Sequence, residues 1–336
     1  MYINKSIFIA VILSALITVS CVKEDLSETG GNFEENFELL WQTINDGYCY
    51  LEYKNINWDS IGTVYRSQLH QEMGDKEFFS LCANMLNELK DGHVGIRSDF
   101  NKVSYGDWYL DYPQNFNSSI VERNYLGKDC FNLGGFQSQK IEDVGYLRYS
   151  SFMNMFSFEQ IDDAVSQLGD ITGLIIDVRD NTGGSVYHAN LLASAFCREK
   201  VLCSYTRYKE GAGDNYSEYF PKYLEPQEKT VFNGNIVVLT NRLCYSATNE
   251  FVNAIRSLSN VTIIGDKTGG GGGMPYSSEL YNGWEFWYSK NPLFDKEKNH
   301  IENGIEPDIY EDMDKNNEYN GIDSIIEKAI NYLKNK

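Results

Sequence analysis

The amino-acid sequence predicts an α/β protein in which a small helical unit precedes a larger domain of mainly parallel strands. From about residue 141 onward, apolar runs typical of buried strands alternate with segments that carry apolar residues at helical spacing. Strands that alternate with helices in this way form parallel sheets. Residues 32–90, in contrast, carry only helical patterns. Hydrophobic residues make up 42% of the 336 residues, which is enough for a well-filled core.

The first residues are expected to direct export rather than to fold. Lys5 precedes an apolar run from Ile7 to Val19, which is shorter than the ~20 residues that a membrane-spanning helix needs. We therefore interpret residues 1–20 as a secretory signal peptide.

Cys21 directly follows this signal, as in lipoproteins, in which the signal is cleaved before a cysteine whose thiol is then acylated. The sequence thus predicts a membrane anchor at Cys21, with simple secretion as the alternative, and a solvated tether over residues 21–31. The tether begins with Lys23-Glu24-Asp25, which resembles an export tag of lipoproteins at the outer cell surface. We expect an outer-membrane lipoprotein of the cell envelope.

Charge and cysteine spacing exclude two classes of function. The formal net charge of -19 repels phosphate backbones, so we expect no nucleic-acid partner. The remaining cysteines match no zinc pattern, and no cluster of His, Glu, Asp or Cys has metal-ligand spacing. We therefore expect no metal and no other cofactor.

The elements follow in order along the chain. Residues 32–95 read as a helical N-terminal domain, and residues 96–140 as a β-rich connector of short strands and turns. Residues 141–336 form the α/β core. Its expected strands lie within 144–152, 173–184, 235–241 and 261–273, and its expected helices within 161–168, 190–197, 246–258 and 321–333.

Ser246 stands where the apolar strand 235–241 gives way to a helix. Serine is a favoured N-cap residue, so a purely structural role is one interpretation. A hydroxyl at such a turn is also exposed at the carboxyl end of a strand, where α/β proteins place their sites. The amide of Ala247 would lie at the helix N-terminus, where it could stabilise an oxyanion. A neutral serine still needs a base.

Two other segments supply candidate partners. The segment "LKDGHVGI" carries His93 at the end of a helix, and "LIIDVRDNTGG" ends a buried strand in charged residues followed by Gly183 and Gly184. Asp177 and Arg179 could merely form an ion pair there. The two glycines could make a tight turn, or their amides could face an anion.

These segments, followed by "VTIIGDKTGGGGG" and "NGIEPDI", resemble the C-terminal processing (tail-specific) peptidases in order and spacing. The resemblance covers roughly residues 32–312. It implies a ClpP/crotonase-like spiral fold for the core. Many relatives insert a PDZ domain after the His segment, but only about 47 residues separate Ile96 from Val144, so we expect no PDZ domain here.

The resemblance also selects between two catalytic layouts. One branch uses a Ser–Lys dyad, with the lysine in the glycine loop, but this loop has Gly271 at that position, and Lys267 lies outside the motif. The tricorn-like branch uses a histidine base and a supporting glutamate near the chain end. It implies that His93 activates Ser246 and that Glu302 supports the site, with Glu306 as its rival.

The resemblance therefore implies a serine endopeptidase that cleaves peptides or unfolded protein segments. Ser246 is the nucleophile, His93 is the base, and the amides of Ala247 and of Gly183 or Gly184 bind the oxyanion. Cys244 is a rival nucleophile and His300 a rival base; we interpret His188 as surface or pocket wall. The alternatives for the whole protein are a catalytically inactive peptide- or ligand-binding lipoprotein of the same fold, an esterase, and, more remotely, a glycan binder.

Overall fold

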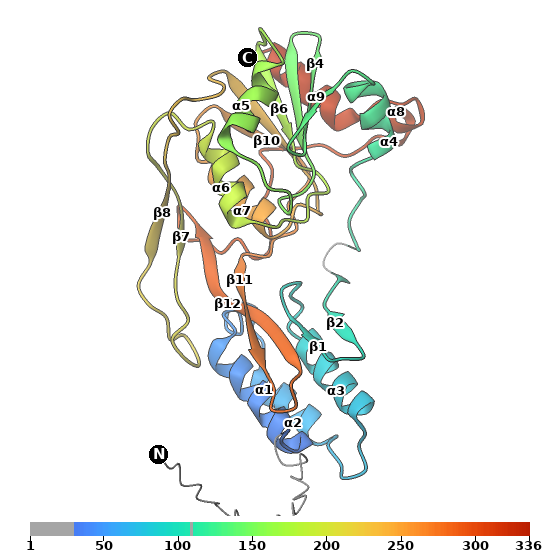
Figure 1. The fold of residues 1–336 in the computed structure, drawn as a ribbon, viewed down its shortest axis with the longest axis vertical. Coiled ribbons are helices and arrows are strands. Elements are labelled where there is room, and N and C mark those ends of the chain that lie inside the picture. Colours follow the sequence, from blue (N-terminus) through green and yellow to red (C-terminus); the bar gives the residue numbers. More distant parts are fainter. Residues whose placement is uncertain (1–29, 108–109) are drawn as a thin grey trace, which may run out of the picture.

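The computed structural model describes residues 30–336 except 108 and 109, and its upper part in Figure 1 is built on a seven-stranded sheet. The strand order is β13-β10-β9-β6-β5-β4-β3, with parallel pairing from β13 to β5 and antiparallel pairing from β5 to β3. The strands span β3 Phe131–Leu133, β4 Phe136–Ile141, β5 Val144–Tyr149, β6 Gly173–Asp177, β9 Asn235–Thr240, β10 Val261–Gly265 and β13 Ile309–Tyr310.

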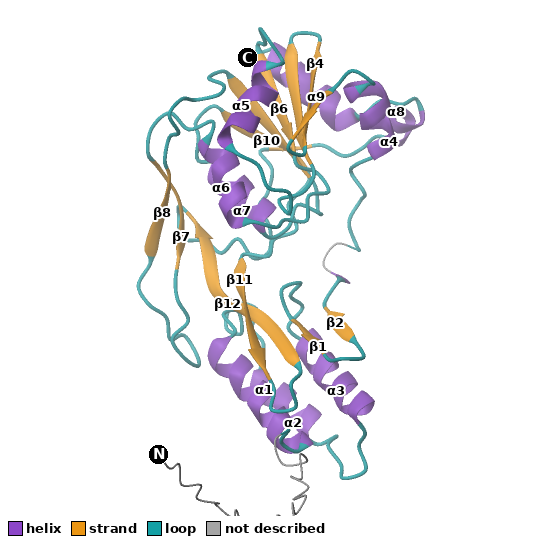
Figure 2. Ribbon diagram, viewed as in Figure 1, coloured by secondary structure: helices purple, strands orange, loops and turns teal. Residues whose placement is uncertain are grey.

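Helices cover both faces of this sheet, which explains why its central strands are apolar without alternation. Leu174 and Ile176 of β6 face the core that α5, α6 and α7 cover, whereas Ile175 between them faces the core under α9. The helix bounds are α5 Phe158–Ser166, α6 Val186–Ser194, α7 Ala247–Ile255 and α9 Ser324–Lys334. The result is a three-layer α/β/α arrangement (Figure 2).

The lower part in Figure 1 contains the N-terminal helices, and a second, six-stranded sheet runs from there up to β7 and β8 at the left. Helices α1 (Phe33–Gly47), α2 (Trp58–Arg66) and α3 (Asp75–Asn87) pack against it. A capping box between Asn32 and Glu35 starts α1. The sheet has the order β2-β1-β12-β7-β8, and β11 also pairs with β12. Its strands span β1 Gly95–Arg97, β2 Lys102–Ser104, β7 Val201–Thr206, β8 Phe220–Leu224, β11 Gly273–Glu279 and β12 Glu285–Asp295.

The N-terminal unit is therefore completed by a hairpin from the far end of the chain. Strand β12 pairs with β1 at one end, through Ile96 and Phe286, and with β7 at the other. The side chains of Phe286 and Tyr288 are buried in the same core as α1 and α3. The two parts of the molecule are thus joined by strands as well as by the chain between β2 and β3.

The segment expected to be a β-rich connector, residues 96–140, is divided in the structure. Strands β1 and β2 belong to the N-terminal unit, and β3 and β4 extend the seven-stranded sheet. The expectation of only strands and turns there is wrong for residues 118–126, which form α4 (Ser118–Ile120) and the π-helix η3 (Val121–Leu126). These residues are helical because they pack on the sheet beside α9, where Val121 and Leu126 are buried.

The sequence-based predictions include no strands for the hairpin β11–β12 or for the pair β7–β8. Besides this local pairing, β12 also pairs with the distant strands β1 and β7. The signal peptide, Cys21 and most of the expected tether lie outside the described residues. Among the residues that are described, no helix combines the length and the apolar character that crossing a membrane requires.

Candidate active site

Ser246 occupies a strained turn between β9 and α7. Its backbone has φ 57° and ψ -122°, in a region that non-glycine residues rarely adopt. Its N–H donates to the carbonyl of Gly270 at 2.9 Å. Although Ser246 holds the N-cap position of α7, its side chain makes no capping hydrogen bond. The hydroxyl is therefore free for another role, and the local strain fixes its direction.

His93 lies against that hydroxyl. Its Nε2 is 2.9 Å from Ser246 Oγ, across 153 positions of sequence. The imidazole packs on the ring of Tyr245, with ring centroids 5.0 Å apart. Burial lowers the pKa of His93 below its usual value, although the negative charge of Asp91 opposes that shift. A neutral imidazole at this distance can accept the serine proton.

Backbone amides flank Ser246 on the side of β6. The N–H of Ala247 opens α7, and a Cβ on Gly183 would lie only 3.0 Å from that nitrogen. The N–H of Gly183 itself already donates to Asn181 Oδ1 at 3.0 Å. The structure therefore argues against Gly183 as an oxyanion donor, because its N–H already donates to Asn181.

Gly184 fits the expected role of second oxyanion donor better than Gly183. It forms a parallel bridge with Phe152, in which Phe152 bonds to the neighbouring residues Gly183 and Ser185. In such a bridge the central residue directs its own N–H away from the partner strand. With φ +137°, and with a Cβ that would lie 2.3 Å from the Phe152 carbonyl carbon, only glycine fits this position.

The glycine loop after β10 closes the other side of the site. A Cβ on Gly270 would lie 1.8 Å from the carbonyl oxygen of Glu302, and one on Gly271 would lie 2.5 Å from the Tyr245 ring. Both residues also have positive φ, 85° and 78°. The loop is held against the closing segment, residues 300–308, since Gly271 N–H donates to the Glu302 carbonyl at 3.0 Å. A lysine at Gly271 has no room in this arrangement.

Asp91 lies two residues before His93, and its buried carboxylate accepts hydrogen bonds from several donors. Its Oδ1 accepts from the backbone N–H of His93 at 2.8 Å, and its Oδ2 accepts from Ser289 at 2.8 Å and from Tyr48 at 3.0 Å. Burial alone would raise the pKa of Asp91, but the charge of Lys54 and the hydrogen bonds hold it below its usual value. Asp91 is thus an anion that fixes the backbone beside His93.

Glu302 lies at the site, but it does not contact His93 directly. Its Oε1 is 2.8 Å from Lys54 Nζ, and its Oε2 accepts from the Gly272 N–H at 2.9 Å. Burial raises the pKa of Glu302 to about 8, and the charge of Asp91 adds to this effect. Its rival Glu306 is exposed and pairs with Lys267 at 2.8 Å, away from Ser246.

The rival residues occupy other surroundings. Cys244 is fully buried, its thiol donates to the Val178 carbonyl at 3.1 Å, and burial raises its pKa. The ring of His300 packs against Tyr53 and Phe294. His188 lies in α6, where its ring packs against Phe156.

Asp177 and Arg179 form a buried ion pair at 2.6 Å, and Arg179 also contacts Asp323 at the start of α9. This pair secures the carboxyl end of β6 rather than contributing reacting groups. Within the described part of the chain, no group of three or more His, Cys, Asp or Glu residues is arranged to hold a metal ion.

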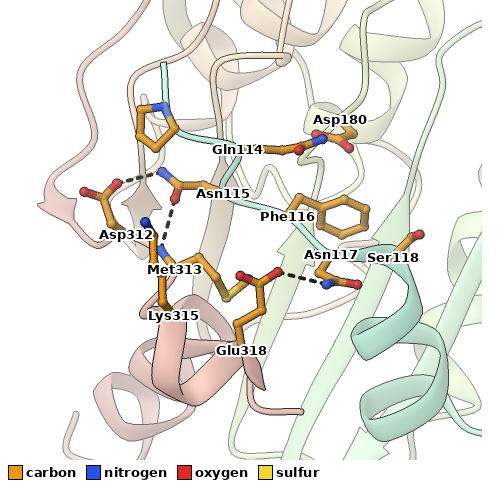
Figure 3. A pocket seen from close by; sticks show the side chains of 11 residues that line it. Gln114, Asn115, Phe116, Asn117, Ser118, Asp180, Asp312, Met313, Lys315 and Glu318 are labelled. Carbon is orange, nitrogen blue, oxygen red and sulfur yellow. Dashed lines mark hydrogen bonds between the residues drawn. The ribbon is translucent and has the colours of Figure 1, made fainter. Parts of the chain in front are cut away.

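A wider cavity, of about 760 Å³, lies away from Ser246 between residues 113–118 and 312–318 (Figure 3). Its polar side chains bond to one another: Asn115 donates to Asp312 at 2.7 Å, and Asn117 donates to Glu318 at 2.9 Å. A smaller cavity of about 150 Å³ reaches the site from the side of Glu302 and Tyr245. The smaller cavity is lined by Asp91, Gly92 and Tyr245, which are sequence neighbours of His93 and Ser246.

Sequence reasoning missed two residues of the site. Asp91 belongs to the quoted "DGH" segment, so its position next to the histidine was a usable signal. Lys54 lies in a turn after α1 with no motif around it, and only the fold brings it to Glu302.

Comparison with known sequences assigns most of the described chain. The profile of peptidase family S41 matches residues 143–311, and that of the tricorn protease C1 domain matches residues 31–87. The carboxyl-terminal-processing protease of Synechocystis sp. is 26% identical over 144 residues, which are 42% of this chain and 31% of that protein. The match thus spans about a third of the length of this curated relative.

Solved structures share the fold of this chain. The crystal structure of a candidate peptidase from Parabacteroides merdae is 40% identical, with a TM-score of 0.86 over 90% of this chain and 97% of that one. Mature CPAF in complex with lactacystin is 12% identical, with a TM-score of 0.68 over 91% of this chain and 99% of that one, and shows the fold alone. These likenesses confirm the predicted fold class, a mixed α/β peptidase core with a helical N-terminal region.

Proposed function

Because the chain belongs to peptidase family S41, we propose that it is a serine endopeptidase that cleaves peptides or unfolded protein segments. The observation that carries this proposal is the 2.9 Å contact between His93 Nε2 and Ser246 Oγ, made by a serine on a strained turn. A structural serine would cap the helix instead, and this one does not.

The geometry supports acyl-enzyme chemistry. Ser246 Oγ attacks the peptide carbonyl carbon while its proton passes to His93 Nε2. The carbonyl electron pair moves onto oxygen, and the amides of Ala247 and Gly184 stabilise the resulting oxyanion; one such donor contributes ~3 kcal/mol. His93 then gives its proton to the leaving amine as the C–N bond breaks. In the second half, water attacks the acyl carbon while His93 takes its proton, and His93 returns that proton to Ser246 Oγ as the ester bond breaks.

The surroundings of the oxyanion turn, residues 181–185, favour an extended, apolar-rich substrate. Met153, Met155 and Tyr187 are 77%, 82% and 70% exposed. They follow closely on Phe152 and Ser185, which bond to each other beside Gly184. Unfolded segments present apolar side chains that folded proteins bury, so such a surface suits them.

The test is active-site labelling of the full-length protein in detergent with a fluorophosphonate, followed by mass spectrometry. We expect one adduct on Ser246, absent in Ser246→Ala and strongly reduced in His93→Ala. Folded protein without any adduct would contradict the proposal and favour a binding protein of the same fold. Adduct formation combined with turnover of esters but of no peptide would favour an esterase.

We also propose that the protein is held in the cell envelope by a lipid on Cys21, which the leader sequence supports. Cells fed an alkyne fatty acid should incorporate it into the protein, and Cys21→Ser should abolish incorporation. Equal labelling of both would show that Cys21 is not the acylated residue.

A further inference from the structure

Lys54 joins two buried carboxylates that come from different parts of the molecule. Its Nζ lies 2.8 Å from Glu302 Oε1 and 3.8 Å from Asp91 Oδ2, and it donates to the Tyr48 hydroxyl at 3.1 Å. The Lys54 side chain is 13% exposed, and those of Glu302 and Asp91 are 4% and 0% exposed. An ammonium placed this deeply between two carboxylates interacts strongly with both, because little water screens it.

The two carboxylates are fixed to opposite halves of the site. The backbone and side chain of Glu302 are bonded to the glycine loop, whose Gly270 carbonyl accepts from the N–H of Ser246. Asp91 accepts from the backbone N–H of His93. A continuous series of contacts therefore runs from the nucleophile's loop through Glu302, Lys54 and Asp91 to the base.

We propose that Lys54 is a positioning residue: by bridging Glu302 and Asp91 it holds His93 at hydrogen-bond distance from Ser246. This inference rests on the proposed function, since a positioned base matters only if Ser246 reacts. Lys54 touches neither reacting atom, and it stands apart from the position of the lysine in a Ser–Lys dyad.

The charges around Lys54, Glu302 and Asp91 determine how the loss of Lys54 would shift the pKa of His93. Burial lowers the pKa of Lys54, but Glu302 and Asp91 outweigh burial and raise it, so the ammonium persists. The charge of Lys54 in turn opposes protonation of His93. Tyr48, Cys49, Tyr50, Tyr53 and Tyr245 also face Lys54, Glu302 and Asp91, and all five have raised pKa values and stay neutral. Tyr105, Lys90 and Arg242 line the adjoining cavity. Lys54 is the cation that lies within 4 Å of both Glu302 and Asp91.

The test compares Lys54→Met, which keeps the length but removes the charge, with Lys54→Arg, which keeps the charge. Lys267→Met is the matched control, because Lys267 pairs with Glu306 in the same closing segment at the surface. The rate of fluorophosphonate labelling is measured against pH for the full-length protein, with thermal unfolding as the check of folding.

For Lys54→Met we expect labelling to slow by about 10- to 100-fold, as for a displaced catalytic group. The acid limb of its pH profile should move to higher pH, because without the Lys54 charge the Asp91 carboxylate favours the imidazolium unopposed. Lys54→Arg should leave the limb near that of the wild type, and Lys267→Met should change neither quantity. Wild-type rate and limb in folded Lys54→Met would overturn the proposal, as would a loss explained by the unfolded fraction alone.

Nuclear magnetic resonance of ¹⁵N-histidine protein separates this inference from the proposed function. The His93 signal is assigned with His93→Gln, and its shifts and titration are followed in each variant. If wild-type protein resists labelling, the proposed function fails, yet displaced His93 shifts in Lys54→Met alone would still support positioning. Unchanged His93 shifts and titration would overturn positioning whatever the labelling result.

Discussion

Ser246 shows how one residue can be unfavourable for the fold and still be needed for the proposed chemistry. Its φ of 57° places Cβ and Oγ on the side of His93, and a residue in such a region costs of order 1–3 kcal/mol. The surrounding hydrogen bonds maintain it: Ser246 N–H to Gly270, and Tyr245 N–H to the Asn181 carbonyl at 3.3 Å. The backbone strain therefore lies at the same residue as the proposed nucleophile.

This strain predicts an unusual order of stability. Ser246→Gly and Ser246→Ala both remove the hydroxyl, but only glycine adopts this backbone conformation without a penalty. We expect Ser246→Gly to be more stable than Ser246→Ala by about 1 kcal/mol or more in urea unfolding. An alanine variant as stable as the glycine variant would mean that the turn relaxes in solution.

At the scale of elements, three neighbouring strands place the site. The oxyanion turn follows β6, Ser246 follows β9, and the glycine loop follows β10, and these strands are adjacent and parallel. Their carboxyl ends therefore meet at one edge, as in other α/β proteins. The base comes from the opposite side, from the segment before β1.

The glycine loop is the tightest of these elements. In Gly270→Ala the new Cβ would lie 1.8 Å from the Glu302 carbonyl oxygen, in a backbone with φ +85°. We expect a loss of more than about 2 kcal/mol of unfolding free energy and loss of Ser246 labelling, because the loop must move away from the closing segment. Denaturant unfolding and labelling measure the two effects.

Gly169→Ala is the control for the backbone conformation alone. Gly169 also has positive φ, 63°, but a Cβ there would meet no atom within 4 Å. We expect it to cost only about 1 kcal/mol and to leave labelling intact. Equal costs for the two variants would show that the close approach to Glu302 is not what makes glycine necessary.

At the scale of the molecule, the site lies between two parts that share a sheet. Much of this was predictable: the α/β core, its order of elements and the helical N-terminal region follow from apolar periodicity. The meeting of His93 and Ser246 was accessible only through the family resemblance, because 153 positions separate them. Neither the pairing of β12 with β1 nor the approach of Lys54 to Glu302 leaves a local pattern, since both depend on the assembled fold.

The ionisation of Glu302 links this assembly to pH. Its pKa is raised to about 8 by burial and by the charge of Asp91, against about 4.3 in an unfolded chain. The folded state thus binds this proton more tightly, and its contribution to stability is complete below about pH 4 and is lost as pH rises through 8. Unfolding free energies at pH 5 to 8.5 should therefore fall more steeply for the wild type than for Glu302→Gln.

Comparing the two proteins cancels groups that titrate in both, such as His93, whose lowered pKa gives a dependence of the opposite sign. Parallel curves for the wild type and Glu302→Gln would show that Glu302 has an ordinary pKa in the folded protein.

The β11–β12 hairpin has a consequence for biosynthesis. The unit that carries His93 is completed by β12, which ends at Asp295, so a growing chain cannot finish that unit until most of its length has been made. Such distant pairing also forms late in folding, because a long loop must close first. Nucleophile and base consequently meet only in a nearly complete polypeptide. If the proposed function holds, the incomplete chain has no assembled site with which to cut itself or its neighbours.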